Sequence, residues 1–263
     1  MERLKFLLIL TAFTFFGFGC IPEKYNVPAT SNAIHEDIPA ETWEQIAPYT
    51  DRFYHYTDEP NQALVVLYRF RANAFSWRFA HDTTAYGISQ WARRIPEAAF
   101  ISNGVFFHEV LFPSGFLKIN SETIGKRQFD LDRSGLITLR PEVRIIDTET
   151  EKIDFNTITD GAQSFPFLIK NGAVAIQEDS ALSARRTFFG TDDAGNVYIG
   201  IVPYRPLTLF ALAQELETLD VPWDHVLNLD GGPSSGIISS FPNSSELFDS
   251  FTTVPNVLVV EPK

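Results

Sequence analysis

The chain has 263 residues, of which 44% are hydrophobic, and its formal net charge is −12. Such an acidic surface repels the backbone of nucleic acids, so the sequence predicts no nucleic-acid partner. A single cysteine excludes an intramolecular disulfide, and 24 phenylalanines can instead supply a substantial core.

The N-terminal segment predicts export. Two basic residues precede an apolar run over residues 6–18, which is too short to span a bilayer and is typical of a secretory signal. We therefore expect a signal peptide over residues 1–19, a lipid anchor on Cys20 and a tether over residues 20–41. These features place the chain at a membrane of the bacterial envelope, in the periplasm or on the outer surface. The alternative is an ordinary signal peptide followed by a chance cysteine.

A single folded domain is expected over residues 42–263. A short helix is predicted at Thr42–Ile46, where a threonine and a glutamine have the spacing of a capping box. A second short helix, Ser89–Arg94, ends before a proline. Runs rich in Val, Phe, Trp and Tyr predict strands at Ala63–Phe70, Phe75–Ala80, Ala98–Ser102, Phe116–Ile119, Leu136–Leu139 and Val143–Ile146.

The second half of the domain adds one amphipathic helix, Thr208–Leu219, whose leucines recur on one face. The oxygen-rich loop Asp192–Asn196 lacks the spacing of a calcium loop and predicts a hairpin turn. Further strands are expected at Phe167–Lys170, Phe188–Thr191, Val197–Val202, Val226–Leu229, Gly236–Ser240 and Asn256–Val260. Many strands with few helices predict an α+β domain built on a large mixed, mainly antiparallel β-sheet with a few packed helices.

The segment Asn228–Gly236 combines glycines with polar side chains directly after an expected strand. Paired glycines let backbone N–H groups approach an anion, and neighbouring hydroxyls add donors. The residues that this pattern singles out are Asp230, Gly231, Gly232, Ser234 and Ser235. The alternative is a plain glycine-rich turn capped by its aspartate.

A second polar segment begins with Asn103 and Gly104 at the end of a strand and continues through Phe106 and Phe107 to Pro113-Ser114-Gly115. Asn103 is placed to orient a sugar hydroxyl or a phosphate oxygen, and one phenylalanine can face a sugar while the other faces the core. The alternative is a turn asparagine with two core phenylalanines.

A third region pairs Gln163 and Ser164 with two arginines, Arg185 and Arg186. Strand alternation sends the arginines to opposite faces, so only one of them is expected to reach a cleft. The planar guanidinium binds two phosphate oxygens at once, which suits a phosphate clamp. The alternative is a surface arginine paired with one of the many carboxylates.

In order, these segments read N-G-x-F-F, P-x-G, Q-S-x-P-x-L-x-x-N-G, R-R-T-x-x-G and N-L-D-G-G-x-S-S. Together they resemble the phosphodiester glycosidase domain family over roughly residues 63–260. That family includes the lysosomal uncovering enzyme, which removes N-acetylglucosamine from its phosphodiester link to mannose, and bacterial exported proteins linked to exopolysaccharide. Val105 and Phe165 depart from the family pattern, which has glycine more often at both positions.

The resemblance implies a hydrolase that cleaves a sugar-1-phosphodiester at the anomeric C–O bond. It marks as site residues Asn103, Gly104, Gln163, Arg186, Asp230, Gly231, Gly232 and Ser235. Asp230 would activate water or act as the nucleophile. Arg186 and the glycine amides would hold the phosphate, while Asn103 and Gln163 would orient the sugar. The substrate would be a phosphorylated glycan.

The second catalytic group is left open, with Glu109, Asp160 and His108 as candidate partners of Asp230. No cofactor and no metal are expected, because the five histidines have no ligand spacing. One rival interpretation is a cell-surface glycan-binding lipoprotein with an inactive site. Another is a phosphodiesterase that cuts P–O, which would normally need a metal cluster.

Overall fold

The computed structural model describes residues 42–56, 63–125, 129–130, 133–242 and 244–263. The expected signal peptide, Cys20 and the tether lie outside the described residues. Within the described part of the chain, no helix is both long and apolar enough to cross a membrane.

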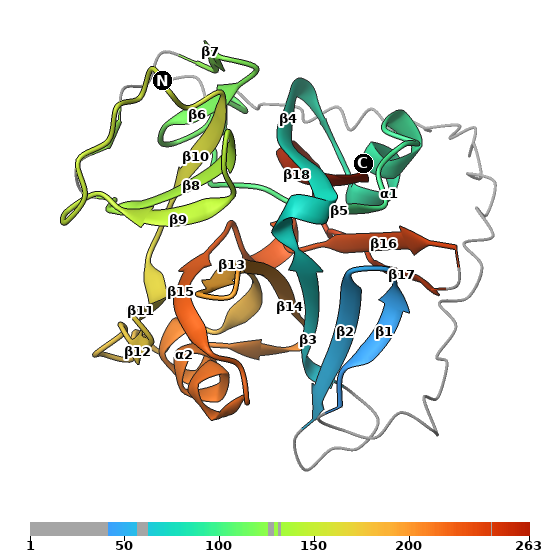
Figure 1. The fold of residues 1–263 in the computed structure, drawn as a ribbon, viewed down its shortest axis with the longest axis vertical. Coiled ribbons are helices and arrows are strands. Elements are labelled where there is room, and N and C mark those ends of the chain that lie inside the picture. The colour runs from blue at the N-terminus through green and yellow to red at the C-terminus, as the bar shows by residue number, and fades with distance from the viewer. Residues whose placement is uncertain (1–41, 57–62, 126–128, 131–132, 243) are drawn as a thin grey trace, which may run out of the picture. The chain divides into compact units, whose positions relative to one another are not determined.

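The first sheet has eight antiparallel strands and one helix against one of its faces (Figure 1). Its order is β1 (Glu44–Ala47), β2 (Thr50–Tyr56), β3 (Ala63–Arg71), β14 (Asn196–Leu207), β13 (Ala184–Asp192), β15 (Trp223–Asn228), β11 (Phe167–Lys170) and β12 (Ala173–Val174). Helix α2 (Leu209–Thr218) begins after Thr208, whose hydroxyl accepts a hydrogen bond from Ala211 N at 3.0 Å. Leu212, Ala213 and Leu216 of this helix are buried against the sheet, as their spacing predicts.

The second and third sheets have five antiparallel strands each. The second contains β7 (Glu122–Thr123), β6 (Leu117–Ile119), β10 (Asp160–Ser164), β8 (Gly135–Arg140) and β9 (Arg144–Asp147). The third contains β17 (Ser244–Phe248), β16 (Ile237–Phe241), β5 (Phe100–Asn103), β18 (Val254–Pro262) and β4 (Phe75–Tyr86). Helix α1 (Ile88–Arg94) packs on the third sheet, and 3-10 turns η1 (Ala72–Ala74) and η2 (Gly232–Ser234) complete the elements.

The principal core lies between the first sheet and the other two. Successive residues of a strand point to opposite faces of its sheet. In β3, Tyr68 and Phe70 therefore face this core, while Leu67 faces α2. In β18, Leu258 faces the same core and Val259 faces α1. Strands buried on both faces therefore appear in the sequence as continuous apolar runs.

The α+β class, dominated by antiparallel strands, is confirmed, and the strands divide among three sheets. The predicted helix at Thr42–Ile46 is wrong, because this segment forms strand β1 against β2. Pro48 follows at once, and Tyr49 adopts a φ of 64° in the turn to β2. A five-residue capping pattern cannot outweigh such pairing, since isolated short helices are unstable. The expected hairpin at Asp192–Asn196 is present between β13 and β14.

Candidate functional site

Three of the segments singled out in the sequence meet at the end of β15. The chain leaves this strand after Asn228, and Leu229 N then donates to Thr187 O at 2.8 Å. The next residue, Asp230, donates its backbone N–H to Gly104 O at 3.2 Å. The loop Asp230–Ser235, which we call the motif loop, is thereby joined to β13 on one side and to the end of β5 on the other.

Asp230 is half-buried, and its carboxylate is held by its own loop. Its Oδ1 accepts a hydrogen bond from Gly231 N at 2.9 Å, and the Ser234 hydroxyl also hydrogen-bonds the carboxylate. Burial raises the pKa of the Asp230 carboxyl above its usual value, and the two hydrogen bonds oppose this rise. The carboxylate is thus partly desolvated yet held in a fixed orientation, as a general base or nucleophile requires.

Asn103 is fully buried, and protein groups occupy both ends of its amide. Its Nδ2 donates to Asp230 O at 2.7 Å, while its Oδ1 accepts from Thr187 Oγ1 at 2.7 Å and from Gly236 N at 3.0 Å. Asn103 therefore links β5, β13 and both ends of the motif loop. This geometry favours a positioning role over the direct contact with substrate that the sequence suggested.

Gly104 lies where no side chain fits. A Cβ at this position would be 2.1 Å from Asn256 Oδ1 and 3.1 Å from Asn256 O. The buried amide of Asn256 accepts from Val105 N at 2.7 Å and donates to Val105 O at 3.0 Å. Asn256 of β18 thus fixes the chain just after Gly104, and the sequence motifs did not point to it.

The two arginines of β13 have different environments, as strand alternation predicts. Arg185 is buried and donates to Asp249 O at 3.2 Å. Arg186 is half-buried, and its Nε and Nη2 donate to Leu207 O at 3.0 Å and Leu182 O at 2.6 Å. Its Nη1 lies 3.7 Å from the point that a Cβ on Gly231 would occupy. The Arg186 guanidinium is therefore anchored by two backbone carbonyls with one nitrogen beside the motif loop.

Gln163 and Ser164 lie on β10 of the second sheet, next to the strand that leads into the motif loop. The buried Gln163 amide accepts from Phe116 N and Asp130 N and donates to Asp130 O and Arg133 O. The Ser164 hydroxyl, also buried, donates to Asn228 O. Both side chains are used within the protein, so Gln163, like Asn103, has the contacts of a scaffold residue.

One of the two departures in the motifs, Phe165, forms an aromatic wall with Phe106, while the other, Val105, is buried in the core. Phe165 and Phe106 are half-buried, with ring centroids 4.7 Å apart, and the Arg133 guanidinium lies 4.1 Å from the Phe165 ring centroid. Arg133 Nη1 donates to Ser114 Oγ at 2.7 Å. Arg133 is a cation that the motifs did not reveal, because it lies outside them in the sequence.

Two polar atoms of the motif are buried without a hydrogen-bond partner among the described residues: Asn228 Oδ1 and Ser235 Oγ. Buried polar atoms normally have partners, so unmet capacity beside a candidate site favours a ligand or water contact there.

The sequence profile of the phosphodiester glycosidase family (NAGPA) matches residues 96–261, which contain every site residue described above. The chain belongs to this family. The profile begins after β4, so it does not cover β1–β4. A search of curated protein sequences gives no match.

Solved structures share the fold of this phosphodiester glycosidase domain. A zebrafish N-acetylglucosamine-1-phosphodiester alpha-N-acetylglucosaminidase catalytic domain, auto-inhibited by its pro-peptide, aligns with a TM-score of 0.60 at 14% identity, covering 86% of this chain and 87% of that one. A hypothetical protein from Synechocystis aligns with a TM-score of 0.61 at 15% identity. That alignment covers 86% of this chain but only 64% of the Synechocystis chain.

Among the described residues, no hydrogen bond or ion pair joins Asp230 to the candidates for a second catalytic group. Asp160 is fully buried, forms an ion pair with Arg140, and begins β10, the strand that ends at Ser164. His108 and Glu109 are exposed on the loop that follows β5. The described contacts therefore supply one carboxylate with a defined place in the site.

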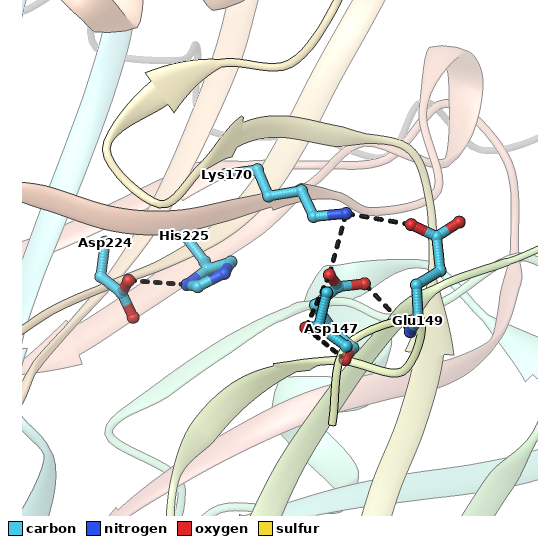
Figure 2. Close-up of polar contacts among 6 residues, drawn as sticks. Asp147, Glu149, Lys170, Asp224 and His225 are labelled. Carbon is cyan, nitrogen blue, oxygen red and sulfur yellow. Dashed lines mark hydrogen bonds and ion pairs between the residues drawn. The ribbon is translucent and has the colours of Figure 1, made fainter. Parts of the chain in front are cut away.

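A group of polar contacts lies towards the other end of β15 (Figure 2). Lys170 of β11 lies between Asp147, at 2.9 Å, and Glu149, at 3.1 Å, while His225 Nδ1 lies 2.8 Å from Asp224 Oδ1. Because Asp147 ends β9 and Lys170 ends β11, this ion-pair cluster joins the second sheet to the first. The contacts of Lys170 therefore hold the second sheet against the first. The second sheet carries Gln163 and Ser164, and β15 of the first sheet leads to Asp230.

A hollow of about 330 Å³ lies away from the motif loop. It is lined by Gln45, Tyr49, Asp51, Arg69, Arg71 and Asn196. Asn196 begins β14, whereas Arg186 pairs with Val202 further along the same strand. None of the predicted site residues lines the hollow. We therefore assign the candidate site to the motif loop, where the predicted residues meet, and not to the hollow.

Proposed function

We propose that this chain hydrolyses a sugar-1-phosphodiester at the anomeric C–O bond and releases the sugar and a phosphate monoester. The observation that carries the proposal is the half-buried Asp230 carboxylate, held by Gly231 N and Ser234 in a loop that the anchored guanidinium of Arg186 borders at Gly231. Membership of the phosphodiester glycosidase family supports the reaction class.

The chemistry suits a site with one carboxylate. Water adds its oxygen to the anomeric carbon, its proton passes to Asp230, and the C–O electron pair leaves with the phosphate. Because the conjugate acid of that leaving group has a pKa of about 6, it needs little protonation by a general acid. Asp230 could instead attack the carbon directly, with water hydrolysing the resulting ester in a second step.

Arg186 and the Gly232 amide are proposed to bind the phosphate, whereas the Gly231 N–H, which the sequence also assigned to the phosphate, is already donated to Asp230 Oδ1. A guanidinium whose carbon stem and two nitrogens are already fixed loses little freedom when it binds an anion. Local donors can also outweigh the acidic surface, because solvent screens distant exposed charges most strongly. Burial lowers the pKa of Arg186, an effect that a bound phosphate would oppose.

The proposed substrates are phosphorylated glycans of the cell envelope or extracellular glycans. This assignment rests on the predicted signal peptide and on the predicted lipid anchor at Cys20. Cys20→Ala should release the mature protein from the membrane fraction, and retention of this variant in that fraction would remove the anchor from the proposal.

The reaction is tested with sugar-1-phosphodiesters in ¹⁸O water. Label in the sugar, lost with Asp230→Asn but retained with the exposed control Asp220→Asn, would support C–O cleavage that depends on Asp230. Label in the phosphate would instead show P–O cleavage and refute the glycosidase proposal. Folded wild-type protein that binds glycans but turns over no diester would favour the rival, a glycan-binding surface lipoprotein.

Arg186→Ala tests whether Arg186 binds the phosphate in a protein that still folds. The expected result is a loss of at least tenfold in kcat/KM, because an interaction between a charged donor and phosphate contributes about 1.5–3 kcal/mol. Normal turnover by the folded variant would exclude Arg186 from the site.

A further inference from the structure

Beside the motif loop, the surface exposes aromatic side chains. Phe251 is 77% exposed and Tyr204 is 55% exposed, although most large apolar side chains of the described chain are buried. The half-buried Tyr56, at the end of β2, lies close enough to Tyr204 for the two phenols to interact electrostatically. We call Phe251, Tyr204 and Tyr56 the aromatic strip.

Phe251 is held in place despite its exposure. Its backbone N donates to Pro233 O at 2.7 Å, and the Arg185 guanidinium lies 4.2 Å from its ring centroid. Arg185 is itself buried and fixed by Asp249 O. The ring therefore has a rigid cationic support behind it, and an exposed aromatic that is already ordered loses little entropy when it binds a ligand.

Phe251 joins the strip to the candidate site. Pro233, which accepts the bond from Phe251, belongs to the motif loop. Arg185 O lies 3.2 Å from the point that a Cβ on Gly231 would occupy. The same residue thus supports the aromatic strip with its guanidinium and borders the motif loop with its backbone.

Tyr204 and Tyr56 extend the strip along the first sheet. The Tyr204 ring packs against Phe248 with centroids 5.9 Å apart. Burial and the charge of Glu246 raise the pKa of both tyrosines, so their hydroxyls stay protonated at neutral pH. Both residues therefore present an aromatic face together with a hydroxyl that can donate or accept a hydrogen bond.

These features fit neutral sugar residues better than other partners. The apolar face of a sugar ring matches an aromatic face, and its hydroxyls match the phenols. A polyanionic ligand fits the strip less well. The protein has a net charge of −12, and the strip offers an exposed phenylalanine face in place of exposed cations.

We propose that the aromatic strip binds the neutral sugar residues joined to the scissile phosphodiester, so that the substrate is an oligomeric or polymeric glycan. This inference rests on the proposed function, because it assigns the part of the substrate that extends beyond the phosphate.

The kinetic test compares two diesters of N-acetylglucosamine-1-phosphate, one with a methyl group and one with a mannose oligosaccharide as the second ester. Phe251→Ala and Tyr204→Ala should each raise KM for the oligosaccharide diester about two- to twelvefold more than for the methyl diester, since stacking contributes about 0.5–1.5 kcal/mol and 1.4 kcal/mol is a factor of ten. Tyr49→Ala, which removes a 64% exposed tyrosine from the β1–β2 turn, should leave both KM values unchanged. Equal effects of the strip variants on both diesters would overturn the proposal.

A binding test is independent of turnover. Calorimetric titration of the folded Asp230→Asn variant with neutral manno- and chito-oligosaccharides should show affinity that rises with chain length and falls about tenfold when Phe251→Ala is added. If the strip binds these oligosaccharides but no diester is hydrolysed, the proposed function fails and the strip stands. If diesters are hydrolysed, but neutral oligosaccharides do not bind and the aromatic substitutions leave KM unchanged, the strip proposal fails and the proposed function stands. Absence of both turnover and binding refutes both.

Discussion

Asn103→Ala is the sharpest test of how the site is built. The substitution removes three short hydrogen bonds, to Asp230 O, Thr187 Oγ1 and Gly236 N. The Thr187 hydroxyl and the Gly236 N–H are buried, so water cannot easily replace the lost amide. A buried donor or acceptor left without a partner costs about 1–3 kcal/mol. Counting about 1 kcal/mol for each of the three groups, we expect a loss of about 3 kcal/mol in the free energy of unfolding.

Urea unfolding followed by tryptophan fluorescence measures this loss. With a slope of about 2 kcal/mol per M, the midpoint should fall by about 1.5 M while the slope stays constant. Asn73→Ala is the matched control, because its side chain is exposed in the turn between β3 and β4, and it should change stability by less than about 0.5 kcal/mol. A loss below about 1 kcal/mol for Asn103→Ala would refute the view that this amide holds the motif loop in place.

Three further substitutions test the site and its supports. Ser234→Ala removes a hydrogen bond that lowers the pKa of Asp230 against the effect of burial, so the acidic limb of the kcat/KM profile should move to higher pH; an unmoved limb would separate Ser234 from Asp230. Burial raises the pKa of Asp147, but hydrogen bonds led by Lys170 outweigh it and leave that pKa lowered. This contribution to stability is present above the ordinary aspartate pKa and is lost as pH falls through the folded value, so the deficit of Lys170→Met in urea unfolding should shrink on acidification. Gly104→Ala should destabilise by about 1–3 kcal/mol, because its Cβ would overlap Asn256; unchanged thermal unfolding would contradict this contact.

The sequence predicts those strands whose apolar residues are buried on both faces. Strands β3, β14 and β18 are such runs, and their existence follows from composition alone. Helix α2 is equally visible, because its buried leucines recur at helical spacing.

Strand β10 could not be predicted from its own residues, Asp-Gly-Ala-Gln-Ser. None of these has high strand propensity, yet all five are buried. Gly161 fits here because a Cβ would lie 2.9 Å from Ile137 O on the adjacent strand β8. The strand therefore forms through its neighbours β6 and β8, which are distant in the sequence.

The meeting of the motif segments was predictable, whereas the geometry of the individual residues was not. Ordered motifs predicted that Asn103, Arg186 and Asp230 belong together, and the structure places their segments in contact. Asn256 was invisible because a single asparagine in a strand has no signature. Its role depends on the pairing of β18 with β5, which sets Val257 opposite Asn103.

The geometry also divides the family motif into two kinds of residue. The amides of Asn103 and Gln163 have their hydrogen-bonding capacity used by the protein, so any variant that folds has reason to keep them. Asp230 differs, because burial raises the pKa of its carboxyl and thereby makes its charge costly at neutral pH. Stability alone would favour a neutral residue at this position. A desolvated carboxylate in a loop that a fixed guanidinium borders fits the catalytic site that we propose, whereas stacking of a glycan on a surface would not need it.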